Sequence, residues 1–557
     1  MHILNLKTAS AVATLSLGLI GAATISAHAA VQTQKAEHAS ATLTMPAGDF
    51  SSAADSAAGA VFEGPRLSSI PDAELVRLKN LGGASNARES VDDAQNSSAS
   101  SRAVFVSCPM NVATGSAPSD VHGAASPTVI IEVTNRDIMI RNKSNCALVS
   151  SMSLATFFSQ NGGFTLAAGE SLFDPRVVYD RLSGRCIVIV ESRNSGNTDQ
   201  FLYVASSRTS SCTTWRRVRW TLSSGTTLFC KAAATNFYDY PNLGYNSTRA
   251  VVTANNFTSS TGSFAYTSVL SIDKPALHGT APVFARCFRS TAYPFSLAPA
   301  VVGDTVLSMY LLSTGAGSGN VIRRFRLTPS GSGAGMTDTL TALSNINIPF
   351  WTAPPDAVQP NGRKLDSLDG RFQSASKQIG SVLWNVHAVN VGGFSRWRMY
   401  KVSNFGTSVL FSRTPTTSTC ANQDHLFNPS IDTNSTSTSA LAFVTASRTC
   451  PSQATAGRAA HLIFRGANAS NTGWVFSLIA TSVNQFTILG GTAGGASCNT
   501  TGVGFRGSCR WGDYSSTQID PSTPTTAWGF NQLITTGSLG GAQSQFNWTT
   551  RGARVGP

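Results

Sequence analysis

The sequence is poor in charged residues, and glutamate is missing from most of it. Charged residues make up 12% of the 557 residues, about half the share in an average soluble domain. The last glutamate is Glu191, so acid chemistry after that position depends on aspartate. The formal net charge is +13, but no long basic tract concentrates it. This spread argues against a nucleic-acid-binding protein and is compatible with an anionic polysaccharide or a cell-envelope partner, or with charge that only aids solubility.

The cysteines form no metal-binding or haem-binding motif. CxxC, CxxCH and mixed His/Cys clusters are absent, which argues against zinc and c-type haem. An even number of cysteines, ten, follows the first 100 residues, and this predicts disulfides and an oxidising compartment. Cys420 with Cys450, and Cys498 with Cys509, are close enough in sequence to form local bridges.

Apolar runs long enough to span a membrane are also missing after the N-terminus. The first 29 residues combine Lys7, a short apolar run and the small-x-small pattern Ala27-His28-Ala29. This pattern predicts a signal peptide at 1–29, and therefore an extracellular or periplasmic protein with no transmembrane span. An uncleaved N-terminal anchor is the alternative.

Residues 30–102 are rich in Ala and Ser and contain few aromatic residues. They offer too little apolar surface to offset the entropy of ordering them, so we expect a flexible leader, cleaved or retained. One short helix is predicted from Pro71, because Pro-Asp opens the segment and Gly-Gly closes it.

From residue 103 to 557 the sequence has the composition of strands and turns. Four short apolar segments at 177–180, 186–192, 200–207 and 215–222 are joined by turns and predict an antiparallel meander. Similar units begin near residues 120, 174, 239, 296, 369, 424 and 513. Repeated four-stranded units predict an all-β fold, a β-propeller of about seven blades, and a monomer. Six blades, or a pair of β-sandwiches, are the alternatives.

The last unit shows only three strands before the end of the chain. We expect the segment AVFVS at 103–107 to supply the fourth strand and close the ring.

Two turns resemble a known repeat. SRTSSCTTW (207–215) and GANASNTGW (466–474) resemble a degenerate Asp-box turn of sialidase-type propellers, with Ser210 and Cys212 in place of the Asp and Gly. FDPRVVYD, DYPNLGYN and RWGDYSSTQIDP resemble the first strands of secreted bacterial propellers with sialidase-like repeats, whose activity is usually unassigned. The resemblance implies the fold but not sialidase activity. That activity needs an arginine triad and a Tyr-Glu pair, and the absence of glutamate after Glu191 counts against this arrangement.

Acidic or amide residues recur where each unit begins. In a propeller the first strand of each blade lines the central channel, so these side chains are expected at its mouth. The candidates are Asp120, Asp174, Asp239, Asp369, Asp424, Asn428 and Asp513. Together they could bind a cation such as Ca²⁺, although the sequence requires no cofactor, or supply an acid and a base for glycosidic cleavage. An Asx turn is the structural alternative for each of them, and Asp174-Pro175 and Asn428-Pro429 fit it directly.

Other candidates lie beside these positions. His425 follows Asp424, which predicts a pKa raised toward neutrality and a catalytic role. The remaining side chains are predicted to contact a sugar: Tyr240, Arg371, Trp384, His387, Trp511 and Tyr514. Core packing is the alternative for the tryptophans and for His387. A serine nucleophile is not indicated, because no GxSxG motif is present.

Three functions remain open from the sequence. The first is binding of a carbohydrate or envelope glycan through the channel face. The second is a polysaccharide hydrolase or lyase that uses the aspartates at the channel mouth. The third is a scaffold for other proteins. The sequence does not decide whether the protein is an enzyme.

Overall fold

The computed structural model of the chain is all-β, as the sequence predicts. It describes residues 32–38, 41–44, 71–80, 92–94, 104–112, 118–194, 196, 198–417, 420–436, 440–467, 474–486, 508–534 and 548–556. Three short helices accompany the strands: α1 (Asp72–Asn80), α2 (Leu154–Ser159) and α3 (Lys274–His278). No helix in these ranges is long and apolar enough to cross a bilayer.

Most strands belong to antiparallel groups of four. The first group contains β5 (His122–Ala125), β6 (Val129–Val133), β7 (Asp137–Asn142) and β8 (Leu148–Ser153). The second contains β9 (Ser171–Asp180), β10 (Arg185–Arg193), β11 (Gln200–Ser207) and β12 (Trp215–Ser224). The third contains β14 (Asn236–Tyr245), β15 (Arg249–Thr258), β16 (Phe264–Asp273) and β17 (Phe284–Ser290). The fourth contains β18 (Ala298–Val302), β19 (Met309–Ser313), β20 (Ser318–Thr328) and β21 (Thr339–Thr352). The fifth contains β24 (Ser376–Ile379), β25 (Val382–Val391), β26 (Phe394–Ser403) and β27 (Val409–Arg413). The sixth contains β29 (His425–Thr433), β30 (Leu441–Thr449), β31 (Ala460–Ala467) and β32 (Val475–Thr481). The last comprises β33 (Ser516–Ile519), β34 (Ala527–Ile534), β35 (Trp548–Val555) and β4 (Val104–Val112).

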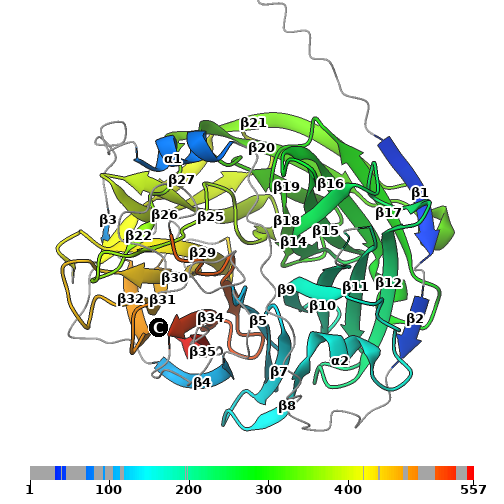
Figure 1. Cartoon of the computed structure of the whole chain (residues 1–557), viewed down its shortest axis with the longest axis horizontal. Coiled ribbons are helices and arrows are strands. Elements are labelled where there is room, and N and C mark those ends of the chain that lie inside the picture. Colours follow the sequence, from blue (N-terminus) through cyan, green and yellow to red (C-terminus); the bar gives the residue numbers. More distant parts are fainter. Residues whose placement is uncertain are drawn as a thin grey trace, which may run out of the picture.

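The first strands of these groups form a closed ring. Each touches the next in the order β5, β9, β14, β18, β24, β29 and β33, and β33 touches β5 again. The other strands radiate outward from this ring, which gives the propeller outline of Figure 1. Because each sheet is covered on both faces by its neighbours, the strand β9 is buried almost throughout, and the hydrophobic clusters lie between adjacent sheets.

The ring is closed by an N-terminal strand. β4 pairs antiparallel with β35, from Val104 opposite Val555 to Val112 opposite Thr549, as the prediction for residues 103–107 requires. The disulfide between Cys108 on β4 and Cys146, in the turn after β7, joins the last group to the first. The sheet next to the C-terminus therefore holds both ends of the propeller together (Figure 1).

Three further disulfides join cysteines within a single group. They are Cys186–Cys212, Cys230–Cys287 and Cys420–Cys450, and the last confirms a predicted local bridge. Cys498 lies outside the described residues, so its pairing with Cys509 stays a prediction. Disulfides of this number are typical of proteins that fold in an oxidising compartment.

The described parts of the predicted leader contact the propeller. The helix expected from Pro71 is confirmed as α1, and its Leu75 and Leu78 are buried against Ala353. The Lys79 ammonium pairs with Asp356 and Asp366.

Short strands of the same region lie at the edges of the sheets (Figure 1). β1 (Gln32–His38) pairs with β17, β2 (Ala41–Thr44) pairs with β12, and β3 (Asp92–Ala94) pairs with β28 (Pro415–Thr417). The first two cover the free edges of outer strands, which would otherwise expose unpaired backbone groups. The remaining short strands are β13 (Thr227–Leu228), β22 (Ala357–Val358) and β23 (Lys364–Leu365).

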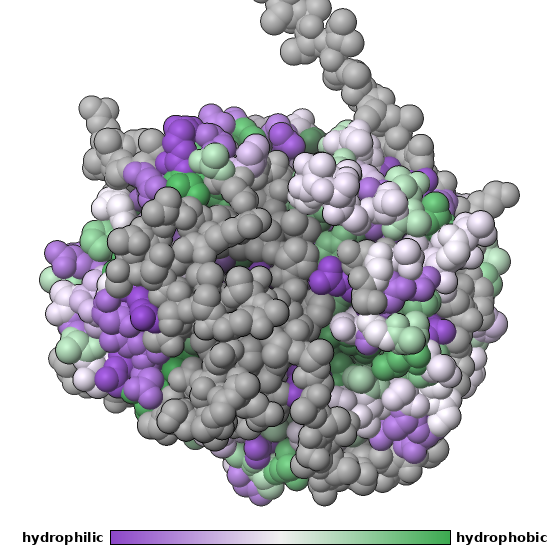
Figure 2. Space-filling view, in the orientation of Figure 1, coloured by the Kyte–Doolittle hydropathy of each residue, from purple (hydrophilic) through white to green (hydrophobic). Residues whose placement is uncertain are grey.

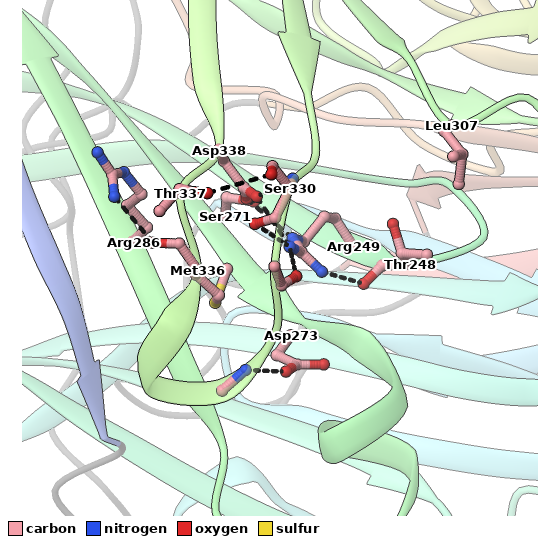
Figure 3. A network of polar contacts seen from close by, with 12 residues as sticks. Thr248, Arg249, Ser271, Asp273, Arg286, Leu307, Ser330, Met336, Thr337 and Asp338 are labelled. Carbon is pink, nitrogen blue, oxygen red and sulfur yellow. Dashed lines mark hydrogen bonds and ion pairs between the residues drawn. The ribbon is translucent and has the colours of Figure 1, made fainter.

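Polar contacts join the third and fourth groups at their outer end. Figure 3 shows Asp338, just before β21, facing Arg249 of β15 and Ser271 of β16. Arg249 donates to both carboxylate oxygens of Asp338 at 2.8 Å, and Ser271 donates to this carboxylate at 2.6 Å.

On the face shown in Figure 2, hydrophobic residues of the described surface occur in separate patches between polar ones.

Candidate functional site

A backbone bend with positive φ occurs where the chain enters the first strand of most groups. Three of these bends lie inside a first strand, at Asp174 (φ 50°), Tyr240 (φ 60°) and Asn428 (φ 54°). Each is followed by a proline and coincides with a register shift against the second strand. Proline has no N–H to donate to the ladder, so it favours such a bulge. Corresponding bends occur at Asp120, Ser296 and Leu368.

The bends bring several predicted residues together at one end of the channel. Asp120 accepts hydrogen bonds from the backbone N–H of Asp513 and from Asn135 Nδ2, both at 2.6 Å. Asn135 also accepts from the backbone N–H of Asp174 at 2.8 Å. Asn428 Nδ2 donates to the carbonyls of Gly512 and Tyr514 at 3.1 and 2.9 Å. These contacts link the last two groups to the first two.

Two tyrosines and two arginines pack beside these carboxyl groups. The rings of Tyr240 and Tyr514 meet edge to face at 5.2 Å. The guanidinium of Arg176 lies 3.3 Å from the Tyr514 ring centroid, and that of Arg371 lies 4.4 Å from the Tyr240 centroid. Both tyrosines are buried, so they are part of the packed centre and do not form an exposed platform for a sugar.

Arg371 is held by its own neighbour in sequence. Its Nε and its NH2 group donate to the two carboxylate oxygens of Asp369 at 2.8 and 2.7 Å. Asp369 also accepts from the backbone N–H of Arg371 at 3.0 Å, which is the Asx turn considered as the structural alternative. Asp513 is likewise paired with Arg510 at 3.2 Å. These two aspartates are therefore neutralised within the protein.

Three other carboxyl groups lack such compensation. Asp174 of β9, Glu191 of β10 and Asp239 of β14 each place a carboxylate oxygen within 4.8 Å of the other two. Their exposed fractions are 8%, 1% and 7%. We call these three residues the carboxylate triad. Asp174 accepts a hydrogen bond from the Tyr514 hydroxyl at 2.7 Å, whereas no donor within the described residues meets hydrogen-bond geometry at either oxygen of Glu191.

Burial and mutual repulsion change the acidity of the triad. Burial, with the charges of Asp239 and Asp513, raises the pKa of Asp174 to about 7. Burial and the charge of Asp513 raise the pKa of Asp239 to about 7. The pKa of Glu191 is raised well above its usual value, mainly by burial, although Arg193 and the backbone N–H of Tyr240 oppose the shift.

Three predicted ligand-contacting residues lie elsewhere. Trp384 belongs to the hydrophobic cluster between the fifth and sixth groups. Trp511 packs against Phe427 and Phe486, and its Nε1 donates to Ser447 Oγ at 3.0 Å. His387 lies between the carbonyl of Gly370 and the hydroxyl of Tyr400, at 2.6 and 2.9 Å. All three are buried, so they fit the core-packing alternative.

The prediction that Asp424 raises the pKa of His425 is wrong. Burial lowers the pKa of His425 to about 3, and the charge of Arg396 adds to this shift. Adjacent residues of a strand point to opposite faces of the sheet, so Asp424 instead pairs with Arg396 at 3.3 Å. His425 Nδ1 accepts from the backbone N–H of Ser395 at 3.2 Å, and a neutral ring of this kind has little capacity for proton transfer.

Next to the triad, the first strands line a small channel cavity. Residues of all seven first strands or the segments just before them line it, among them Lys377, Asn242, Ser374, Asp432 and Gln518, but none of the triad does. Both side-chain polar atoms of Asn242 and the hydroxyl of Ser374 are buried and have no hydrogen-bond partner in the part of the chain that the structure describes. Lys377 forms an ion pair with Asp432 at 3.0 Å.

We expect the triad to make stability depend on pH. The folded-state pKa of Asp239 is about 7 and its unfolded value is near 4. Between these values the folded state holds the extra proton, so this group's contribution to stability falls as pH rises, by about 1.4 kcal/mol per pH unit at most. Asp239→Asn should therefore gain stability relative to wild type between pH 5 and pH 8, as measured by chemical denaturation with EDTA present.

The comparison with wild type is needed because buried histidines titrate in the opposite direction. Burial lowers the pKa of His387 and of His461 to about 3, so their contribution to stability rises with pH up to their unfolded pKa near 6.5. Thr198→Ala, in the loop after β10, removes no ionisable group and is the control, with a difference from wild type that should not change with pH. A pH-independent difference for Asp239→Asn would contradict the expectation.

Comparisons with known proteins give structural likeness only. No family model matches the chain, and no curated protein matches its sequence. Among solved structures, a Hadza microbial sialidase is 10% identical, with a TM-score of 0.37 over 77% of this chain and 74% of that one. The GH93 α-L-arabinofuranosidase of Fusarium graminearum is 9% identical, with a TM-score of 0.34 over 85% and 98%. A phage phi92 endosialidase is 8% identical, with a TM-score of 0.31 over 81% and 68%.

Proposed function

We propose that the protein binds a carbohydrate, such as an envelope glycan, in the channel cavity. The observation that carries the proposal is the set of unpartnered polar groups on Asn242 and Ser374 that line it. A buried amide without partners costs free energy, and a ligand that hydrogen-bonds it recovers that cost.

The lining suits a sugar better than a purely apolar or a strongly charged ligand. Hydroxyl and amide side chains line the cavity together with aliphatic ones, and Arg176 and Arg181 add positive charge. The polar members include Ser376, Ser430, Ser516, Thr517 and Gln518, and the aliphatic members include Val178, Leu243, Val301 and Ile431. A pyranose has hydroxyl groups at its edge and C–H groups on its faces, so it matches both kinds of surface. The pairing of Lys377 with Asp432 leaves these two charges mutually compensated.

The binding test is a glycan array followed by calorimetry with the best hit. Asn242→Leu keeps the side-chain volume and removes both polar atoms, and the loss of about 1–3 kcal/mol should weaken binding about 5- to 150-fold. Ser374→Ala should weaken it less. Asn194→Leu, in the loop after β10, is the control and should bind like wild type. Equal affinity of Asn242→Leu and wild type, with equal melting temperatures, would reject the channel as the site.

Glycoside hydrolysis is the second candidate, because one observation favours it. Asp174 and Asp239 both have pKa values of about 7, and their carboxylate oxygens lie within 4.8 Å of each other. A protonated carboxyl beside an ionised one can act as acid and nucleophile, and retaining glycosidases place the pair about 5–5.5 Å apart. A reducing-sugar release screen on the array hits tests this role. Release that survives Asp174→Asn combined with Asp239→Asn would exclude it.

A further inference from the structure

The carboxylate triad combines short distances between acidic oxygens with deep burial. Three negative charges within 4.8 Å repel one another strongly where little water screens them. Proteins keep buried charges by pairing them or by using them as metal ligands. Asp369 and Asp513 illustrate pairing, with Arg371 and Arg510, whereas within the residues that the structure describes no carboxylate of the triad forms such an ion pair with an arginine.

Glu191 provides an independent sign that a ligand is missing. Its side chain is 1% exposed, and one of its oxygens lies within 4.8 Å of both aspartates. In the described part of the chain no donor meets hydrogen-bond geometry at either oxygen, although the backbone N–H of Tyr240 and the charge of Arg193 favour its ionised form. The residue lies in the buried apolar run CIVIVES of β10, where an apolar side chain would fit the surroundings. A cation at the centre of the triad would give this carboxylate a direct partner.

We propose that Asp174, Glu191 and Asp239 form a binding site for a single divalent cation, with Ca²⁺ as the best match. The donor set consists only of carboxylate oxygens, which hard cations prefer. Ca²⁺ binds oxygen at about 2.3–2.6 Å, so oxygens on opposite sides of one ion are separated by about 5 Å. Mg²⁺ binds at about 2.0–2.1 Å, which requires every pair of oxygens to lie within about 4.2 Å. The three oxygens lie within 4.8 Å of one another, which is close to the span of a Ca²⁺ coordination sphere.

The charges near the site match a dication. The three ionised carboxylates carry three negative charges, and the guanidinium of Arg193, which interacts electrostatically with all three, contributes one positive charge. Arg193 lies over the rings of Phe173 and Phe237, with its guanidinium 5.6 and 4.8 Å from their centroids. Arg176 also acts on Asp174, and a divalent ion would offset the negative charge that these arginines leave. Because the ion stabilises the ionised carboxylates, its affinity should increase as pH rises through neutrality.

The site is distinct from the channel cavity, whose lining includes none of the three residues. The proposal therefore does not depend on carbohydrate binding. It competes with the hydrolytic candidate, because a carboxylate engaged on a cation cannot donate a proton to a glycosidic oxygen. Cation binding and sugar release are measured separately, so each hypothesis can fail without the other.

Tb³⁺ luminescence tests the site directly. The hydroxyl of Tyr514 is bonded to Asp174 at 2.7 Å, so excitation of the tyrosine should sensitise emission from Tb³⁺ bound there. After treatment with a chelator and its removal, the full chain should bind Tb³⁺ saturably at one equivalent. Ca²⁺ should displace it, and Ca²⁺ should also raise the melting temperature.

Glu191→Gln keeps the side-chain shape and should lower the affinity for Tb³⁺ and Ca²⁺ at least tenfold. Glu132→Gln is the matched control: Glu132 is also a fully buried glutamate, with a pKa raised to about 7 mainly by burial, but it lies in β6. The affinity of the Glu132→Gln variant for Tb³⁺ and Ca²⁺ should equal that of wild type. Absence of saturable binding to wild type, equal binding by Glu191→Gln, or equal loss in both variants would overturn the proposal. If Glu191→Gln does not fold, Asp239→Asn replaces it under the same criteria.

Discussion

A chain lacking residues 104–112 is expected to lose its cooperative thermal transition. The deletion removes the strand that pairs with β35 and the partner of Cys146. Loss of a native disulfide typically costs about 2–5 kcal/mol, and removing β4 also uncovers the cluster around Trp528 and Phe530. The sum approaches the whole free energy of unfolding of a typical domain, about 5–15 kcal/mol.

Deletion of residues 32–44 is the matched control. It also removes strands that pair with outer strands, β17 and β12, but the groups they cover already contain four strands. Its melting temperature should stay within a few degrees of wild type. Circular dichroism melts of the two deletions decide the question, and a cooperative transition at the wild-type temperature for the 104–112 deletion would contradict ring closure by β4.

Replacing Asp338 by alanine is expected to destabilise the protein by about 3–5 kcal/mol. The substitution leaves the guanidinium of Arg249, which is 2% exposed, without its carboxylate partner, and it removes the acceptor of Ser271 and of the backbone N–H of Ser330. Figure 3 shows that these groups converge on Asp338. An uncompensated buried charge costs far more than a pair gains, so the effect should appear in the free energy of unfolding measured by denaturant titration.

Two comparisons separate this mechanism from a general effect of truncation. Glu74→Ala breaks the ion pair with Arg77 on the surface of α1, and exposed pairs contribute about 0–1 kcal/mol. Replacing both Arg249 and Asp338 by Met and Leu removes both charges together and should recover much of the lost stability. A cost for Asp338→Ala that is no larger than the cost for Glu74→Ala would contradict the assignment.

The fold could be predicted because its signals are local and repeated. The segments 186–192, 200–207 and 215–222 lie within β10, β11 and β12, since turn residues mark their ends. β9 begins at Ser171, before the predicted Val177, because its bulge at Asp174-Pro175 interrupts the regular pattern. The closing strand was predictable by elimination, as the last unit contained one strand too few.

The central residues were predictable where the repeat identifies them. Asp120, Asp174, Asp239, Asn428 and Asp513 occupy equivalent places at the start of the first strands, and the ring brings equivalent places to one axis. Trp384 and His387 come from a second strand, β25, which lies farther from that axis. Their side chains therefore fill the space between sheets.

Glu191 was missed because it belongs to no repeat. It lies on the second strand of its group, where pairing with β9 places it opposite Phe173 and beside Asp174. The contacts of β9 and β10 with β14 bring Asp239 close to both. The available signal was a single charged residue at the end of the apolar run CIVIV, in a chain with no later glutamate. A buried acid in such a setting indicates a specific partner, which sequence spacing alone does not reveal.

The pairing of β4 with β35 also has a consequence for biosynthesis. A ribosome completes β4 long before it makes β35, so the growing chain carries an unmatched strand until its last residues are available. The bond from Cys108 to Cys146 closes a short loop and can hold that strand against the first sheet meanwhile. A chain that stops before β35 has no partner for it, so the last sheet can be completed only after β35 has been made.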